Sequence, residues 1–335
     1  MYRAILKDSR RHLAVKVQHP RILRKVLGDF YLLQVFSSFL ENLPGLNLGY
    51  LSLGDSIRQF RRSMLPQMDF ESEARNLARF RRDFQGDEDV NFPEPIMDLT
   101  SREVLVESFV SGEPIARFLE EDEDHTKNDR QRLAKIGLKM TMEMIFLHDF
   151  VHGDLHPGNI LVDKVDGKIR MNVLDGGLVL ELGEREHKNL VGVLGAFIKR
   201  DGHGAGRLMV DNMADNQSTE TDVKLFCEGL VSLIKHDEEN VSYPFLCFPF
   251  QHALIMQNFL ENVGDYLTEI CFLACRHKIK LDASFINVAI ACEIMEGIAS
   301  ALYPEMMVQR IAIPMMAKAE LMHGIKQFKI PNFIN

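Results

Sequence analysis

Alternating apolar and polar residues open the chain, and the spacing then becomes helical. Residues 2–6 and 12–17 alternate on either side of a polar turn, which predicts two neighbouring strands. From about residue 22 to residue 43, apolar side chains recur every three or four positions, which predicts a helix that ends at Pro44-Gly45. The chain therefore begins with a small mixed region.

The middle of the chain also alternates between predicted helices and strands. Residues 53–84 have helical spacing that breaks near Pro66, and Asp69 is of a residue type that starts helices. Residues 104–110 predict a strand, and residues 129–149 predict a strongly periodic helix.

A hairpin and a long helical region follow. Asp166-Gly167 has the composition of a tight turn between strands at residues 160–163 and 169–174. From residue 184 to residue 323 the pattern is almost entirely helical, with prolines as breaks. We therefore predict an α+β fold of two lobes. The first, residues 1–110, is small and mixed with a helical insert at about 21–60. The second, residues 111–335, is large and helical.

Composition narrows the class of function. The chain has 335 residues, of which 46% are hydrophobic and 26% charged, so it can bury a sizeable core. Its net charge is −9. An acidic balance argues against binding to nucleic acid, which needs a basic surface.

Cysteines and apolar stretches leave minor alternatives open. The five cysteines are an odd number in a long chain, so we expect no disulfide framework. Cys271, Cys275 and His277 could hold a metal, but they lack the paired clusters of a zinc module, and an apolar helix face is the competing interpretation. No uncharged apolar stretch of about 20 residues is evident, so we predict no membrane span. Residues 241–260 form either a peripheral membrane-facing surface or a packed helix or loop.

The strongest chemical motif is His152-Gly-Asp-Leu-His-Pro-Gly-Asn159, which follows a helix and precedes a hairpin. Phosphoryl transfer needs a carboxylate that orients or deprotonates the acceptor hydroxyl, and an oxygen ligand for a metal that bridges phosphates. Kinase catalytic loops supply both with the spacing D-x-x-x-x-N. This spacing predicts Asp154 as the catalytic base and Asn159 as a magnesium ligand.

Three further residues complete this pattern. Asp175 follows the hairpin, where kinases place a second magnesium ligand, and the glycines after it allow a sharp turn. Lys16, in Ala14-Val-Lys-Val17, would reach the α- and β-phosphates, with Glu73 as its carboxylate partner. The strand alternation predicts that Leu13, Val15 and Val17 face one side and Lys16 the other. Together these motifs specify the two-lobed fold as protein-kinase-like, with ATP and Mg²⁺ as cofactors.

The same layout predicts the place of the nucleotide base. We expect adenine near the strand at 104–110, with the main chain of Glu107 to Val110 as the linker that contacts the ring and Leu161 below it. His152 and His156 flank Asp154. They could be metal ligands, but such loops usually use histidine to hydrogen bond to the backbone, which is the interpretation we favour.

These motifs resemble those of the UbiB/aarF-domain atypical kinases. HGDLHPGNILV, AVKVQHP and DFESEARN carry the resemblance, which extends to about residue 180, and Asp-Gly-Gly at residues 175–177 is most similar to the aarF-domain-containing kinase two subgroup. The resemblance implies a kinase-like fold with extra helices between the lysine strand and the glutamate helix. It also implies ATP and magnesium binding, mitochondrial localisation in eukaryotic members, and a link to ubiquinone biosynthesis and lipid homeostasis.

The chain departs from the family pattern in three respects. The K-x-G-Q extension and the nucleotide loop with its first strand are not in the sequence, which we interpret as N-terminal truncation. A transit peptide would be missing for the same reason. Gln67 stands where the family has a glutamate, although Asp69 is kept. A loss of phosphate positioning would impair phosphoryl transfer.

Two functional hypotheses follow from these observations. One is an ATP-dependent phosphotransferase or ATPase whose acceptor is water or a small lipid-like or quinone-precursor molecule. The other is a catalytically impaired, ATP- or lipid-binding scaffold within a mitochondrial biosynthetic complex. A third, an aminoglycoside-phosphotransferase-like enzyme, shares the His-Gly-Asp loop, but the long insert and DFESEARN argue against it.

Overall fold

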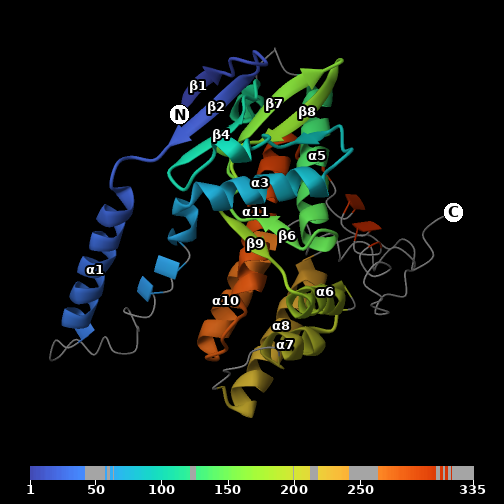
Figure 1. The fold of residues 1–335 in the computed structure, drawn as a ribbon. Helices are drawn as coiled ribbons and strands as arrows, with labels where there is room; N and C mark the ends of the chain where they lie inside the picture. Colours follow the sequence, from blue (N-terminus) through green and yellow to red (C-terminus); the bar gives the residue numbers. More distant parts are fainter. Residues whose placement is uncertain are drawn as a thin grey trace. The chain divides into compact units, whose positions relative to one another are not determined.

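A computed structural model gives the structure of the chain (Figure 1). It describes residues 1–41, 57–58, 61–62, 64–120, 126–198, 200–211, 218–240, 263–306, 310–311, 314–315 and 318. Most of the predicted insert after residue 41 and the stretch 241–260 therefore lie outside the described residues. The described part is mixed, with short strands and a helical majority.

The chain divides into two compact units. Unit 1 consists of Met1–Gly112 and Asn172–Leu178, and unit 2 of Glu113–Met171 and Val179–Asn335. Unit 1 ends two residues beyond the limit that we predicted for the first lobe. It also includes Asp175 and its neighbours, which the sequence placed with the second lobe, because this segment packs on a helix of unit 1 as described below.

Unit 1 is built on an antiparallel sheet with the order β1-β2-β4. Its strands are β1 (Tyr2–Ile5), β2 (His12–Val17) and β4 (Val104–Ser108). Lys16 lies opposite Leu105 and Ala14 opposite Glu107. The short strand β3 (Val90–Asn91) adjoins the end of β8, where Asn91 Nδ2 donates to Asn172 Oδ1 at 2.8 Å.

The helices of unit 1 precede β4 in the sequence. They are α1 (Ile22–Glu41), the 3₁₀ helices η2 (Pro66–Met68) and η3 (Met97–Leu99), and α3 (Phe70–Asp83). α1 starts where the sequence predicted a helix. α3 buries Ala74 and Leu77 against Leu105 of β4, with Phe70 at the edge of this cluster. These residues lie three or four positions apart on α3, so one face of the helix covers the sheet.

Unit 2 contains two small groups of strands. β5 (Glu113–Pro114), β7 (Ile160–Val165) and β8 (Lys168–Val173) follow one another in one sheet, and β6 (Phe150–His152) pairs with β9 (Val179–Glu181). The turn between β7 and β8 is Asp166-Gly167, as predicted. Both residues have positive φ angles, 51° and 77°, as the type I′ form of a two-residue hairpin turn requires.

Helices make up most of the remaining described part of unit 2, and α6, α7 and α8 lie side by side in Figure 1. The helices are α4 (Ala116–Leu119), α5 (Lys127–Phe146), α6 (Glu184–Ile198), α7 (Gly202–Asp211), α8 (Glu220–Asn240), α10 (Val263–Arg276) and α11 (Ala283–Leu302). A 3₁₀ turn, η4 (Pro157–Asn159), precedes β7. Phe226 and Leu230 of α8 are fully buried at the centre of one cluster.

The helix α11 is long and strongly apolar. By length and composition, Ser284–Leu302 could cross a membrane. We predicted no membrane span from the sequence because this stretch carries Glu293 and Glu296 and is therefore not uncharged. α11 packs against α5 and α10 and buries Met295 and Ile298, and 33% of the stretch is buried. Core helices of globular proteins can have the same length and composition, so this feature alone does not establish a membrane span.

Candidate active site

Lys16 and Glu73 form an ion pair in unit 1. Lys16 Nζ lies 2.7 Å from Glu73 Oε1, and it lies 3.4 Å from the carbonyl oxygen of Leu174. The side chains of Lys16 and Glu73 are 15% and 5% exposed. The pairing predicted from the sequence is therefore present, although 57 residues separate the partners.

The local sequence explains why α3 presents Glu73. Asp69 caps the helix and accepts a hydrogen bond from Glu71 N at 3.0 Å. Glu71 and Glu73 lie in the first turn of α3, and Arg81 and Arg82 lie in the last. Charges of these signs at the two ends interact favourably with the helix dipole and stabilise the helix. Glu73 and Leu77 are four residues apart on the face of α3 that is buried.

Asp175 joins this pair from the segment after β8. Its Oδ2 lies 3.9 Å from Lys16 Nζ, and its Oδ1 accepts from Gly177 N at 2.7 Å. Asn76 of α3 donates to the carbonyl oxygen of Gly176 at 2.8 Å. A β-carbon on Gly176 would lie 3.1 Å from Leu77 Cγ, so glycine permits the close approach that holds Asp175 beside α3.

Glu107 is a fourth member of the group, in a role that the sequence did not predict. Its Oε1 lies 3.6 Å from Lys16 Nζ, and the residue is only 2% exposed. Its main chain lies inside β4, between Ala14 and Pro95. Glu107 is a strand residue whose carboxylate is directed to the lysine, and the expected contact of its main chain with adenine stays a prediction. The strand ends one residue later, at Ser108.

Burial and neighbouring charges together shift the pKa values of Lys16, Glu73 and Glu107. Burial alone would lower the pKa of Lys16, but attraction by Glu107, Glu73 and Asp175 outweighs it and the pKa is raised. Burial raises the pKa of Glu73 despite the attraction of Lys16. Burial also raises the pKa of Glu107 to about 7, again opposed by Lys16 and assisted by the two other carboxylates. The site therefore holds more negative charge than one lysine balances.

The predicted catalytic loop lies in unit 2, between β6 and β7. His152 Nδ1 accepts from Asp154 N at 3.0 Å, and His156 Nδ1 accepts from Gly158 N at 3.0 Å. Asn159 Nδ2 donates to the carbonyl oxygen of Asp154 at 3.1 Å. Both histidines therefore hydrogen bond to the backbone, as favoured from the sequence. The side chain of Asp154 is 51% exposed, so a substrate could reach it.

The remaining predicted contacts involve residues of different units. Asp154, Asn159 and Leu161 belong to unit 2, whereas Asp175 and Val110 belong to unit 1. A shared metal between Asn159 and Asp175 stays a prediction, and so does a shared adenine contact of Val110 and Leu161. Leu161 lies on β7 opposite Pro114, and both Val110 and Leu161 are half-buried.

No metal cluster forms from protein ligands alone in the described part of the chain. There, no group of three or more histidine, cysteine, aspartate or glutamate residues could hold a metal ion. Cys271 and Cys275 are free thiols, and they belong to no such group. Magnesium is usually held by one or two carboxylates together with water and the phosphates of a substrate, rather than by a cage of protein ligands.

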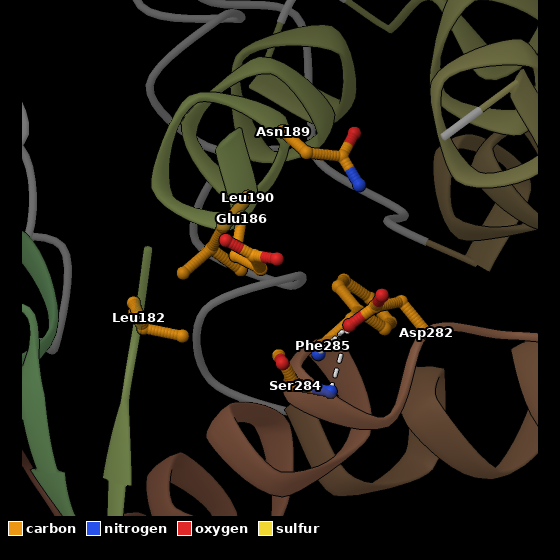
Figure 2. Close-up of a pocket in the computed structure, with 7 residues that line it drawn as sticks. All are labelled: Leu182, Glu186, Asn189, Leu190, Asp282, Ser284 and Phe285. Carbon is orange, nitrogen blue, oxygen red and sulfur yellow. Dashed lines mark hydrogen bonds between the residues drawn. The ribbon is translucent and has the colours of Figure 1, made fainter. Parts of the chain in front are cut away.

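A small pocket in unit 2 is separate from these residues. Figure 2 shows it between α6 and the start of α11, with Glu186 and Asn189 on one side and Asp282 and Phe285 on the other. Asp282 accepts hydrogen bonds from Ser284 N and Phe285 N at 2.7 and 3.3 Å (Figure 2). Its carboxylate thus caps α11, and the pocket contains none of the predicted catalytic residues.

Comparison with protein families gives a match over more than half of the chain. The profile described as ABC1 atypical kinase-like domain matches residues 1–209. This range includes Lys16, Glu73, Asp154, Asn159 and Asp175.

Curated proteins give concordant similarities. The chain is 25% identical over 399 residues to "Probable serine/threonine-protein kinase abkC" of Dictyostelium discoideum, covering 100% of the chain and 54% of the relative. It is 27% identical to "ABC1 family protein C21C3.03, mitochondrial" of Schizosaccharomyces pombe, covering 92% and 47%. It is 27% identical to "Probable protein kinase UbiB" of Aliivibrio fischeri, covering 69% and 43%. The chain thus spans about half the length of the curated relatives that it matches.

Proposed function

We propose that this chain, which belongs to the family of ABC1 atypical kinase-like domains, binds ATP with magnesium and acts as a phosphotransferase or ATPase. The observation that carries the proposal is the pairing of Lys16 with Glu73 at 2.7 Å, with Asp175 at 3.9 Å from the same ammonium group. A lysine held by a helix carboxylate beside a second, more exposed carboxylate is the phosphate- and metal-binding half of a phosphoryl-transfer site.

Each residue has a defined role in this proposal. Lys16 attracts the phosphates, and Glu73 fixes the position of its ammonium group. Asp154, whose side chain is half exposed, orients or deprotonates the acceptor hydroxyl or a water molecule. Asn159 uses Nδ2 for its hydrogen bond to the loop, which leaves the amide oxygen Oδ1 for a metal.

Asn159 and Asp175 have the ligand chemistry that magnesium prefers, an amide oxygen and a carboxylate. The side chain of Asp175 is 37% exposed, so a hydrated ion could reach it. The residues present therefore fit the ion. When bound, magnesium would neutralise charge on the phosphates.

The acceptor and the cellular setting are proposals from family resemblance. We propose a small lipid-like or quinone-precursor acceptor and a role in ubiquinone biosynthesis or mitochondrial lipid homeostasis, within a biosynthetic complex. A yeast relative is named mitochondrial, which supports a mitochondrial location for this protein. Peripheral contact with a membrane belongs to the same proposal.

A second candidate is an ATP- or lipid-binding scaffold that does not turn ATP over. One observation favours it: Glu107 is a further buried carboxylate beside Lys16, and its negative charge opposes the placement of Lys16 on the phosphates, on which turnover depends. The scaffold and the enzyme differ in turnover, so a turnover measurement separates them.

The test compares ATP binding and phosphate release in the natural chain and in Asp154→Asn. The enzyme proposal expects release to fall by about 10²-fold or more in Asp154→Asn while ATP binding is kept. Asp166→Asn is the matched control, because Asp166 lies in the hairpin turn at φ 51°, where asparagine is equally well tolerated. ATP binding with equally low release in all three proteins supports the scaffold. Absence of ATP binding contradicts the enzyme and the ATP-binding form of the scaffold.

A further inference from the structure

Three carboxylates surround the ammonium group of Lys16, and Glu107 is the most buried of them. The distances to Lys16 Nζ are 2.7 Å from Glu73, 3.6 Å from Glu107 and 3.9 Å from Asp175. Glu107 Oε2 is buried and has no hydrogen-bond partner among the residues that the structure describes. A buried carboxylate without full hydrogen bonding is costly, so its presence needs an explanation.

The sheet register places Glu107 at this point. Ala14 lies opposite Glu107, and Lys16 is two residues beyond Ala14 on β2. Side chains two residues apart on a strand share a face, so Glu107 and Lys16 are diagonal neighbours across the β2–β4 pair. Glu73 reaches the same ammonium group from α3. Lys16 is therefore held between the sheet and the helix.

The two glutamates differ in how they bind the lysine. Glu73 makes a hydrogen bond, whereas the 3.6 Å between Glu107 Oε1 and Lys16 Nζ is too long for one. Glu107 thus acts through its charge. That charge lies in a poorly solvated region, where it attracts the ammonium group and repels an approaching phosphate more strongly than it would in water.

We propose that Glu107 is a positioning residue that competes with the nucleotide phosphates for Lys16, so that the charge of Glu107 sets the phosphate affinity of the site. The ionised carboxylate holds Lys16 and weakens phosphate binding, and the neutral carboxyl group releases Lys16 to the phosphates. This proposal rests on the proposed function, because it requires that Lys16 binds phosphate.

The surroundings of Glu107 support a change of its charge near neutral pH. β2 contributes Lys16, α3 contributes Glu73 and the segment after β8 contributes Asp175; all three act on Glu107, whose pKa is raised to about 7. His12 of β2 and Asp98 of η3 are exposed. Phosphate binding should therefore weaken as pH rises through neutrality.

The experiment measures the dissociation constant of ATP with excess magnesium for the natural chain, Glu107→Gln and Glu103→Gln between pH 6 and pH 8.5. Glu103 is the control, because it is exposed and directly precedes β4. We expect Glu107→Gln to bind ATP about tenfold more tightly at pH 8.5, and the difference to shrink toward pH 6. Glu103→Gln should match the natural chain.

A merely structural role for Glu107 predicts the opposite sign, since damage to the site weakens binding. Glu107→Met is a second variant that removes the charge and suits a buried position. It should also bind ATP more tightly, and it keeps the test decisive if Glu107→Gln folds poorly. Equal or weaker binding by both variants at pH 8.5 overturns the proposal. If the natural chain binds ATP in an Asp175-dependent manner while the variants show no gain, only this inference fails. If none of the proteins binds ATP, the proposed function fails with it.

Discussion

Glu107 Oε1 lies 3.6 Å from Lys16 Nζ because Lys16 is two residues from Ala14, the strand partner of Glu107. Lys16 is therefore shared between a sheet carboxylate and the helix carboxylate of Glu73. With Asp175 also within 4 Å, one ammonium group faces three acidic groups. The site is built to gain positive charge, from a proton or from a metal ion.

The ion pair of Lys16 and Glu73 should position the lysine for phosphate. Replacement of Glu73 by Gln removes its charge and leaves Glu107 as the nearest full charge to Lys16. We expect phosphate release from ATP to fall by about 10²-fold, since a small misplacement of a phosphate-binding group has an effect of this size. Steady-state kinetics of the variant measure it.

Glu71→Gln is the matched control for that variant. Glu71 lies in the same turn of α3, and its ion pair with Arg75 at 3.9 Å is exposed, so it should contribute little. If phosphate release fell equally in Glu71→Gln and Glu73→Gln, the loss would come from the changed charge of the helix and not from the contact of Glu73 with Lys16.

The stability of the protein should depend on pH through Glu107. Its pKa rises from an ordinary 4.5 when unfolded to about 7 when folded, so the folded state holds the proton more tightly. Between these values the unfolded state binds fewer protons, and stability must fall as pH rises from about 4.5 to 7, by on the order of 3 kcal/mol. The raised pKa of Glu73 acts in the same direction.

Denaturant unfolding at pH 5 and pH 8 measures this dependence. Glu107→Gln should be more stable relative to the natural chain at pH 8 than at pH 5, and Glu103→Gln should show no such change. An unchanged difference between Glu107→Gln and the natural chain at the two pH values would contradict the raised pKa of Glu107.

Gly176 should be needed for the approach of the Asp175 segment to α3. In Gly176→Ala, the new β-carbon would lie 3.1 Å from Leu77 Cγ and 3.4 Å from the carbonyl oxygen of Glu73. We expect a loss of about 1–3 kcal/mol of stability and weaker magnesium-dependent ATP binding. Thermal unfolding with and without the ligand reports both.

Gly28→Ala is the control for Gly176→Ala. Gly28 lies inside α1, and apart from the adjoining main chain no described residue has an atom within 4 Å of a new β-carbon. Alanine should therefore leave stability unchanged or raise it by about 0.5–1 kcal/mol. Destabilisation of both variants to the same extent would indicate that the contact with Leu77 is not the cause.

The capping residue Asp69 should stabilise the first turn of α3, which carries Glu73. Asp69→Ala removes the acceptor for Glu71 N and should cost about 1 kcal/mol of stability. Asp69→Asn keeps a capping oxygen and should be close to neutral. Thermal unfolding that ranks Asn below Ala would disprove the capping role.

The sequence predicted the elements whose signals are local. β2 has the predicted bounds, β1 is one residue shorter than predicted, and α3 starts after Asp69, because alternation, a polar turn and a capping residue each specify local structure. Strands of two or three residues, such as β5 and β6, were missed because they are too short to show a period. Val17 was assigned to an apolar face, yet it is 48% exposed at the end of its strand.

The candidate site was predictable in part for the same reason. Kinase-like motifs identified Lys16, Glu73 and Asp175, and the structure brings both carboxylates within 4 Å of Lys16 Nζ. The position of Glu107 was not predictable, because it depends on the register between β2 and β4, two strands far apart in the sequence. Likewise, residues 172–178 belong to unit 1 because they contact α3, and no local sequence pattern predicts that contact.

The most direct test of the central claim is the thermal shift of this chain by ATP with magnesium, compared with Asp175→Asn. A ligand that binds only the folded state raises the melting temperature, and more so as its concentration exceeds the dissociation constant. We predict a rise that needs magnesium, is lost in Asp175→Asn and is kept in the hairpin control Asp166→Asn. A folded chain whose melting temperature does not respond to magnesium and ATP, or responds equally in Asp175→Asn, would contradict it.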